Sequence, residues 1–336
     1  MVGVKDLVLR LLSQHPEGVL QSSIHRAIGT SKSRVSEVLR ELEAAGVISR
    51  VKLGNQYLVK ALKPYEGRGV EGRVVKLGVV WSSEYPFIAP FAKELRDRFN
   101  YVLDVTVYPN ALRATWALVR GEVDLVLSPL ITQLYAFSLT KALRIVGGGA
   151  YGGAAVMEGS PRYPNVVASS ELSAMDACRA AALGEEVPKG LKTVYFSRPE
   201  DAVRLAIEGR ARYFVVWHPL TERLSLLGLK HVALCKDLEI TYCCTLAASV
   251  RLNQFLRRRI ALTYSKAIEE FVREPGRWVE WYSAKVGLPV DVVRRGLGMY
   301  SYRPYLDKAL IGRMLSRVGL QLPDPNAALN AIEEFT

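Results

Sequence analysis

The sequence contains few of the residues from which proteins build metal or nucleophilic centres. Its 336 residues include four cysteines and four histidines. No two cysteines form a Cys-x-x-Cys pair and no histidines have the His-Glu-x-x-His spacing, which argues against a zinc ribbon or a zincin-type site. There is no Gly-x-Ser-x-Gly nucleophile elbow. The glycines of Gly147–Gly153 open no helix and lack the Lys-Ser/Thr of a phosphate loop. We therefore predict no catalytic residue, no metal site and no cofactor.

Long apolar segments are also missing. No stretch of about 20 apolar residues occurs, so no membrane-spanning helix is predicted. Lys5, Asp6 and Arg10 interrupt any apolar core of an export signal, and we expect a cytoplasmic protein. In a reducing compartment the cysteines should be buried thiols without disulfides. For the adjacent Cys243 and Cys244, the simplest interpretation is two thiols in an apolar strand, and the alternatives are pocket lining or sensing of an oxidant or soft metal.

Basic residues are in excess, and their density is highest near the N-terminus. The net charge is +12 and hydrophobic residues make up 49% of the chain. Residues 1–73 hold 12 basic and 7 acidic side chains, a net charge of +5 in about a fifth of the sequence. The length favours about two domains of roughly 150 residues. A basic N-terminal domain favours a polyanionic partner.

The segment Ser31–Gly46, SKSRVSEVLRELEAAG, has the periodicity of an amphipathic helix. Val35, Val38, Leu39 and Leu42 recur at the spacing of one helix face. Thr30 or Ser31 can cap its start, and Gly46 can end it. The opposite face carries polar and charged side chains, which suit a DNA groove or, more simply, solvent. The candidate base-contacting residues on this face are Lys32, Ser33, Arg34, Ser36, Glu37 and Arg40.

The surroundings of this helix favour the DNA-binding interpretation. Two shorter helical patterns precede it, with apolar stripes from Val4 to Leu12 and from Leu20 to Ile28, and two β-rich segments flank Leu53-Gly54-Asn55 after it. Three helices followed by a basic hairpin resemble the winged helix-turn-helix domains of bacterial and archaeal transcription regulators. The resemblance implies that the hairpin residues Arg50 and Lys52, with Lys60 as a further candidate, contact phosphates. It implies a domain over residues 1–63.

Residues 64–73 read as a linker, because they combine three glycines, a proline and alternating charges. From Val74 the pattern alternates between strand and helix and predicts a parallel α/β sheet over the first four strands. A second α/β block follows the Gly147–Gly153 cluster, then a return segment and a helical tail.

Two α/β blocks, a crossover, a return segment and a helical tail resemble the type 2 periplasmic-binding-protein fold. Leu118–Pro129 and Phe255–Pro289 are similar to segments of its branch that includes thiamine-pyrimidine synthase-like, nitrate- and sulfonate-binding proteins. The resemblance implies a two-lobed α/β ligand-binding domain over residues 74–336. Its first lobe would comprise about 74–155 and 240–336, and its second about 156–239.

In such a fold, strand ends and helix N-termini converge on a cleft between the lobes. The candidate ligand-binding residues are those that follow strands or begin helices there: Ser82, Ser83, Glu84, Tyr85, Ser128, Thr132, Tyr151, Ser169, Ser170, Trp217 and His218. Simpler interpretations are helix caps for Ser169 and Ser170 and a core position for Trp217.

These features predict a transcription regulator that binds double-stranded DNA as a homodimer and responds to a small-molecule effector. The alternative is an enzyme of the thiamine-pyrimidine synthase type with a fused DNA-binding head. The identity of the effector, and repression as against activation, stay open.

Overall fold

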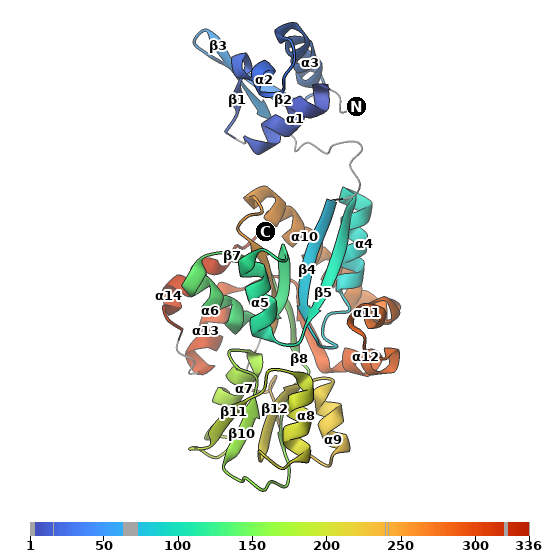
Figure 1. The fold of residues 1–336 in the computed structure, drawn as a ribbon, viewed down its shortest axis with the longest axis vertical. Helices are drawn as coiled ribbons and strands as arrows, with labels where there is room; N and C mark the ends of the chain where they lie inside the picture. Colours follow the sequence, from blue (N-terminus) through green and yellow to red (C-terminus); the bar gives the residue numbers. More distant parts are fainter. Residues whose placement is uncertain are drawn as a thin grey trace. The chain divides into compact units, whose positions relative to one another are not determined.

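The computed structural model describes residues 4–15, 17–62, 73–238, 240, 242–318 and 322–335. The chain divides into two compact units, of which the first ends at Gly72 and the second begins at Arg73. Figure 1 shows both units. Apart from Arg73, the predicted linker lies outside the described residues. Arg73 itself is the first residue of a strand.

The first unit contains three helices and a three-stranded antiparallel sheet in the order β1-β3-β2. Its elements are α1 Val4–Gln14, β1 Val19–Leu20, α2 Gln21–Ala27, α3 Lys32–Ala44, β2 Ile48–Leu53 and β3 Gln56–Ala61. The order helix, strand, helix, helix and hairpin is that of a winged helix-turn-helix domain. Leu20 pairs with Leu58 in the sheet and does not begin the second helix, as its apolar spacing had suggested.

The core of this unit explains the position of α3. Val35, Val38, Leu39 and Leu42 are all buried, as the helical periodicity predicts. Of the two candidate caps it is Ser31 that caps the helix, accepting a hydrogen bond from the backbone N–H of Arg34 at 3.3 Å. The inward face of α3 therefore packs in the core, and its outward face is left accessible to a partner.

The second unit has two lobes. The sheet of lobe 1 has the order β5-β4-β6-β14-β7. Its elements up to the crossover are β4 Arg73–Val80, α4 Ile88–Phe99, β5 Tyr101–Tyr108, α5 Ala111–Arg120, β6 Leu125–Pro129, α6 Leu130–Thr140 and β7 Leu143–Gly147. The four strands predicted to be parallel, β4, β5, β6 and β7, do run in one direction, but β7 is not paired with β6: β14 (Cys244–Ser249) from the return segment lies between them and runs antiparallel to both. Strand order depends on where a distant segment inserts, and the alternation of local patterns does not contain that information.

Helices cover both faces of this sheet, since its strands are apolar on both sides. Leu77 and Val79 of β4 belong to the same core as α4 and α10 (Gln254–Arg273). Val80 and Val126 face the other way and pack in the core formed with α5 and α6. The polar residues that follow β4 and β6 are therefore held at one end of a rigid layer.

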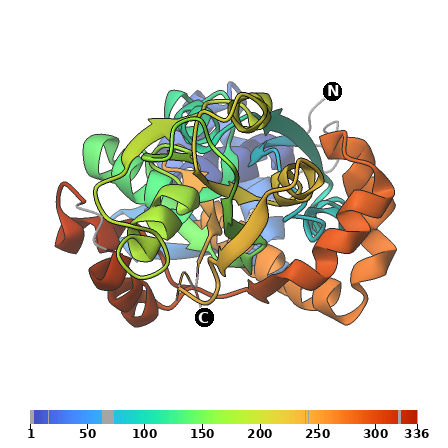
Figure 2. The same cartoon turned by 90° about the horizontal axis from the view of Figure 1, so that it is seen from below.

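Lobe 2 is a five-stranded sheet in the order β11-β10-β12-β9-β13. Its elements are β9 Ala154–Glu158, β10 Val166–Ser169, α7 Ala174–Ala182, β11 Lys192–Tyr195, α8 Pro199–Ile207, β12 Tyr213–Trp217, α9 Leu220–Leu226 and β13 Lys230–Leu234. Strand β9 runs antiparallel to both of its neighbours. Figure 2 has this lobe nearest the viewer.

The glycine-rich crossover forms a short strand that the sequence pattern did not predict. Strand β8 (Gly149–Gly152) pairs with β15 (Tyr300–Arg303) from the tail. A Cβ atom at Gly148 would lie 2.0 Å from the carbonyl oxygen of Arg303, and one at Gly149 would lie 2.1 Å from that of Cys244. These glycines are required by close backbone packing where the chain passes between the lobes, which agrees with the absence of a phosphate loop.

The tail folds back onto lobe 1. Its remaining elements are the 3-10 helices Pro275–Trp278, Leu297–Met299 and Leu329–Ala331, and the helices α11 Val279–Val286, α12 Val290–Gly296, α13 Lys308–Val318 and α14 Pro325–Ala328. Among the described residues, no helix is both long enough and apolar enough to cross a membrane.

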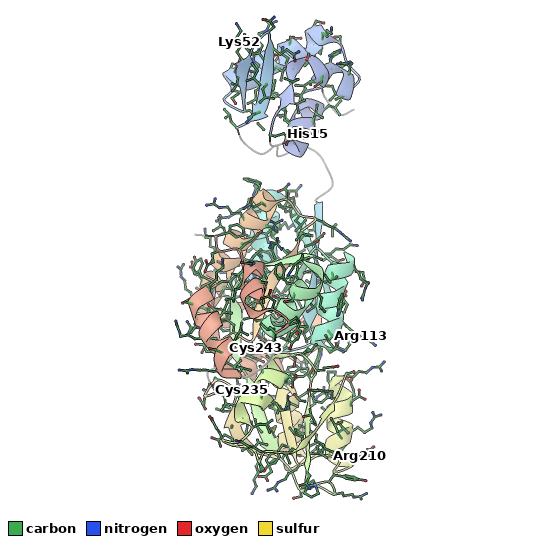
Figure 3. All side chains as sticks on the ribbon, turned by 90° about the vertical axis from the view of Figure 1, so that its left-hand side faces the viewer. His15, Lys52, Arg113, Arg210, Cys235 and Cys243 are labelled. Atoms are coloured by element: carbon green, nitrogen blue, oxygen red, sulfur yellow. A yellow bond between two sulfur atoms is a disulfide. The ribbon has the colours of Figure 1, made fainter. Side chains whose placement is uncertain are left out.

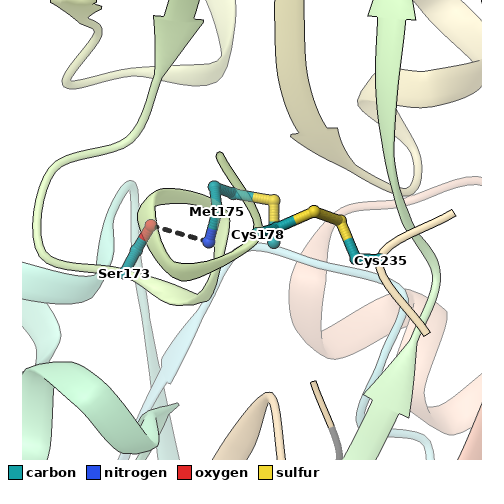
Figure 4. The surroundings of a disulfide bond; sticks show 4 residues. All are labelled: Ser173, Met175, Cys178 and Cys235. Carbon is teal, nitrogen blue, oxygen red and sulfur yellow. Dashed lines mark hydrogen bonds between the residues drawn. A yellow bond between two sulfur atoms is a disulfide. The ribbon is translucent and has the colours of Figure 1, made fainter. Parts of the chain in front are cut away.

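Two of the four cysteines form a disulfide, contrary to the prediction. Cys178 of α7 is bonded to Cys235, which follows β13, across 57 residues of sequence. Figure 4 shows the bond beside Met175, whose backbone N–H donates to the hydroxyl of Ser173. The prediction was wrong because it was based on a reducing compartment, and because the sequence does not show which cysteines lie close together in the folded chain. Cys243 and Cys244 are free and buried, as predicted.

Candidate functional site

The outward face of α3 offers the first candidate site. Lys32, Ser33, Arg34, Glu37 and Arg40 are exposed, and Ser36 is partly exposed. Arg34 donates to Glu37 at 2.6 Å, and this bond raises the pKa of the Arg34 guanidinium. Because both side chains are exposed, the pair contributes little to stability and can open toward another partner. Arg40 and Lys32 carry positive charge on the same helix.

The hairpin residues differ from one another. The Arg50 guanidinium donates from Nε to the Glu43 carboxylate at 2.9 Å and lies over the ring of Tyr57. Hydrogen bonding from Arg50 lowers the pKa of the Glu43 carboxyl. Arg50 thus holds the hairpin against α3. Lys52 is exposed near the hairpin tip (Figure 3), and its side chain has no hydrogen bond or ion pair with any of the described residues.

The second candidate site is a small cavity of about 30 Å³ between the two lobes of the second unit. Lobe 1 contributes residues that follow β4 and residues at the start of β14, and lobe 2 contributes the N-terminus of α7 and the end of β12. Five of the predicted ligand-binding residues line it: Ser82, Glu84, Tyr85, Ser170 and Trp217. Among the described residues, no lysine, arginine or histidine lines this cavity.

Glu84 is the most unusual group in the cavity. Its side chain is buried, and its Oε1 atom has no hydrogen-bond partner among the residues that the structure describes. Burial raises the pKa of the Glu84 carboxyl to about 8, an effect that hydrogen bonds from Cys244 and Tyr85 only partly offset. A buried carboxyl without a cation beside it is costly to ionise.

Two thiols lie beside Glu84. The Sγ atoms of Cys243 and Cys244 are 3.8 Å apart, and the Tyr85 hydroxyl donates to the Cys244 sulfur at 3.0 Å. Burial raises the pKa of the Cys244 thiol well above its ordinary value. One carboxylate oxygen of Glu84 and the two sulfurs all lie within 4.8 Å of one another. Figure 3 places Cys243 close to the junction of the two lobes.

Cys243 and Cys244 line the cavity, which was predicted only as an alternative to two thiols in an apolar strand, and they were not among the candidate ligand-binding residues. Their position at the start of a strand that pairs with β6 could not be read from local pattern. Ser173 and Met175 were also missed, although they belong to the predicted N-terminal region of α7. Both could have been predicted, because helix N-termini face the cleft in this fold.

The other predicted ligand-binding residues lie outside the cavity lining. Ser128 is hydrogen-bonded to Thr115 at 2.8 Å inside lobe 1, and Tyr151 lies under the guanidinium of Arg303. Thr132 donates to the carbonyl oxygen of Leu172 at 2.5 Å, which joins the lobes. Ser169 is buried without a hydrogen-bond partner for its hydroxyl among the described residues.

Ser83 and His218 form a contact between the lobes. The Ser83 hydroxyl lies 2.5 Å from His218 Nδ1, and His218 Nε2 lies 2.9 Å from a carboxylate oxygen of Glu222. Burial lowers the pKa of His218, although Glu222 opposes this shift. A serine hydroxyl, a histidine ring and a carboxylate that lie next to one another in this order in space resemble a nucleophilic triad. Ser83 is only 1% exposed and does not line the cavity, so a substrate has no access to it in this conformation.

Further contacts hold the lobes together. Arg295 of α12 donates to both carboxylate oxygens of Glu222 at 3.0 Å each, and this pairing lowers the pKa of the Glu222 carboxyl. The indole N–H of Trp217 donates to the carbonyl oxygen of Trp81 at 2.8 Å. The structure therefore has the two lobes in contact around the cavity.

Comparisons with known proteins found a family profile and a regulator relative, each of which matches a part of the chain. A family profile described as "Domain of unknown function (DUF7343)" matches residues 4–62. The HTH-type transcriptional regulator Rv1719 of Mycobacterium tuberculosis is 31% identical over 120 residues, which cover 33% of this chain. The match spans 44% of the length of that regulator.

The second unit is similar to solved binding proteins. The alkanesulfonate-binding protein SsuA from Xanthomonas axonopodis pv. citri aligns with a TM-score of 0.62 at 18% identity, covering 79% of this chain and 99% of that one. The second unit has the fold of the periplasmic binding proteins. The nitrate-binding protein NrtA from Synechocystis PCC 6803 aligns with a TM-score of 0.63 at 13% identity, covering 78% of this chain and 86% of that one.

The predicted fold class is confirmed: a helix-turn-helix head precedes a two-lobed α/β domain of the periplasmic-binding-protein type. Identities below a fifth show the fold of this domain and not its ligand.

Proposed function

We propose that the chain is a DNA-binding transcription regulator whose affinity for its operator is set by a small effector bound between the two lobes. The observation that carries the proposal is the combination, in one chain, of similarity to an HTH-type transcriptional regulator with a domain of the binding-protein fold. Neither a transport component nor an isolated enzyme needs such a head. DNA as partner places the protein in the cytoplasm.

In this proposal α3 enters the major groove. Its exposed residues Lys32, Ser33, Arg34, Ser36, Glu37 and Arg40 contact base edges and neighbouring phosphates. The exposed Lys52 and the partly exposed Lys60 contact phosphates from the hairpin. Arg50 was a further candidate for phosphate contact, but because it is engaged by Glu43 we assign it to positioning of the hairpin.

The effector binds where the lobes meet. A ligand that favours one arrangement of the lobes shifts the population toward that arrangement. In a homodimer this shift changes the spacing or orientation of the two heads, and symmetric half-sites then bind more or less tightly. The cross-lobe bonds of Arg295 with Glu222 and of Ser83 with His218 are the contacts that such a shift would break.

The alternative of a synthase-type enzyme has less support. The cavity holds no described basic group, and the triad-like Ser83 and His218 lie outside its lining. The regulator relative and the binding-protein fold are consistent with a protein that is not an enzyme.

Selection from a random duplex library with the full chain tests DNA binding. We expect a preferred sequence whose affinity falls about 5- to 150-fold in Arg40→Ala, corresponding to about 1–3 kcal/mol. Lys5→Ala, an exposed position on α1, serves as the control in the same head and should bind as the parent does. Failure to enrich any sequence, or equal binding by Arg40→Ala and its parent, would remove α3 from the interface.

A further inference from the structure

The free cysteines and Glu84 form a cluster that the proposed function does not explain. Glu84 follows β4, whereas Cys244, the first residue of β14, and the preceding Cys243 lie about 160 residues later. The sheet of lobe 1 brings them together, with one candidate ligand atom from each residue within 4.8 Å of the others. All three side chains are buried.

One carboxyl oxygen of the cluster has no partner within the part of the chain that the structure describes. Oε1 of Glu84 has no hydrogen-bond partner among the described residues. No described basic side chain lines the surrounding cavity. Buried polar atoms are nearly always paired in native proteins, so an exception calls for a partner such as an ordered water or an ion. Here the missing partner must be positively charged or a hydrogen-bond donor.

The spacing of the sulfurs fits a tetrahedral metal centre. With a Zn–S distance of about 2.3 Å, two thiolates at tetrahedral angles are separated by about 3.8 Å. The two Sγ atoms are 3.8 Å apart. A carboxylate oxygen of Glu84 lies within 4.8 Å of both sulfurs, so Glu84 is the candidate for a third ligand.

The donor set selects the kind of ion. Thiolates exclude Mg²⁺ and Ca²⁺, which take oxygen ligands, and a carboxylate is a poor ligand for Cu⁺. Two thiolates with one carboxylate suit Zn²⁺, and three protein ligands leave a fourth position for water or another ligand. The cavity of about 30 Å³ has room for about one water-sized group at that position.

We propose that Glu84, Cys243 and Cys244 bind one Zn²⁺ ion between the lobes, and that this ion is the effector or its anchoring point. The second clause rests on the proposed regulatory function, and the first does not. On binding, the two thiols and the carboxyl lose their protons to solvent and no electrons are transferred. Met175 and Ser170 line the same cavity from lobe 2, so occupation couples the ion to the arrangement of the lobes.

Titration of the metal-free full chain with Co²⁺ tests the site, because Co²⁺ replaces Zn²⁺ in tetrahedral sites and has an absorption spectrum. We expect one Co²⁺ per chain, a thiolate-to-cobalt charge-transfer band in the near ultraviolet, and loss of that band when one equivalent of Zn²⁺ is added. Cys243→Ser and Cys244→Ser should each weaken the band, and Glu84→Gln should lower the affinity at least tenfold. The control Glu280→Gln, at an exposed position, should change neither.

Absence of the band in the parent protein overturns the proposal without reference to any variant. A band of full intensity in a folded Cys243→Ser or Cys244→Ser variant overturns it as well, and thermal melting establishes which variants are folded. DNA binding is measured separately on the same samples. A zinc site without DNA binding refutes the regulatory function alone, and DNA binding that is unchanged by bound Zn²⁺ refutes the effector role alone.

Discussion

Glu84 makes the stability of the second unit depend on pH in a direction opposite to that of most carboxylates. Its pKa is raised from 4.5 to about 8 by burial, so the folded chain binds a proton that the unfolded chain releases. The stabilisation is fully present below about pH 4.5, declines as the pH rises and is lost above about pH 8. The pKa difference, at about 1.4 kcal/mol per pH unit, corresponds to about 5 kcal/mol over this window.

The comparison of the parent with Glu84→Gln isolates this contribution, because glutamine has the same shape and does not titrate. We expect the free energy of unfolding of the variant, relative to the parent, to rise by about 1.4 kcal/mol per unit between pH 5 and pH 8. Urea unfolding in the presence of a chelator measures it. All five tryptophans lie in the second unit, so their fluorescence follows the unit that contains Glu84.

Glu280→Gln is the matched control, since Glu280 is exposed and its substitution should not alter the pH dependence. A constant difference between Glu84→Gln and the parent from pH 5 to pH 8 would show that the Glu84 carboxyl is not desolvated in the folded protein.

Three further predictions concern other parts of the chain. Lys52→Ala should lower the slope of log affinity against log salt for DNA by about 1, and an unchanged slope would remove the hairpin from the phosphate contacts. Removing the Cys178–Cys235 disulfide with Cys178→Ser should lower the free energy of unfolding by about 4 kcal/mol, as expected for a loop of 57 residues. Urea unfolding under non-reducing conditions measures this difference, and equal stability of variant and parent would contradict the disulfide. Arg295→Ala breaks the ion pair with Glu222 and should shift the lobes toward an open arrangement, seen as a larger radius of gyration in X-ray scattering, whereas the exposed Arg277→Ala should not.

Much of the fold follows from local pattern. The strand Tyr101–Tyr108 and the capped helix after Asn110 lie where apolar periodicity and capping chemistry place them. The buried residues of α3 were predicted by spacing alone. Such features depend on neighbours within a few residues, and these are visible in the sequence.

What could not be predicted depends on contacts between distant segments. The insertion of β14 between β6 and β7 and the pairing of Cys178 with Cys235 are set by the tertiary fold. The same insertion brings Cys243 and Cys244 to Glu84. Strand ends identified Glu84 and Ser170 as cleft residues, whereas Ser128 follows the same rule and is instead bonded inside lobe 1. Position at a strand end gives the region of a site but not the direction of each side chain.

The residues of the cavity argue against transferring the ligands of the structural relatives to this domain. The aligned binding proteins are named for alkanesulfonate and nitrate, which are anions. In this chain a buried carboxyl and two thiols occupy the cavity, and no described basic side chain lines it. The shared fold supplies two lobes and a junction, and the residues at that junction set the chemistry of the ligand.

The central claim is that the arrangement of the lobes controls DNA binding by the head, and it can be tested without knowing the effector. Ser170 lines the small cavity from lobe 2, so Ser170→Trp wedges the lobes apart, and Lys192→Trp, at an exposed position of the same lobe, is the control. The measurement is the Kd of the full chain for its selected duplex by fluorescence anisotropy. We predict that Ser170→Trp changes this Kd at least fivefold and that Lys192→Trp leaves it unchanged. An equal Kd for Ser170→Trp and the parent, with the opened lobes verified by X-ray scattering, would contradict the coupling between cleft and DNA.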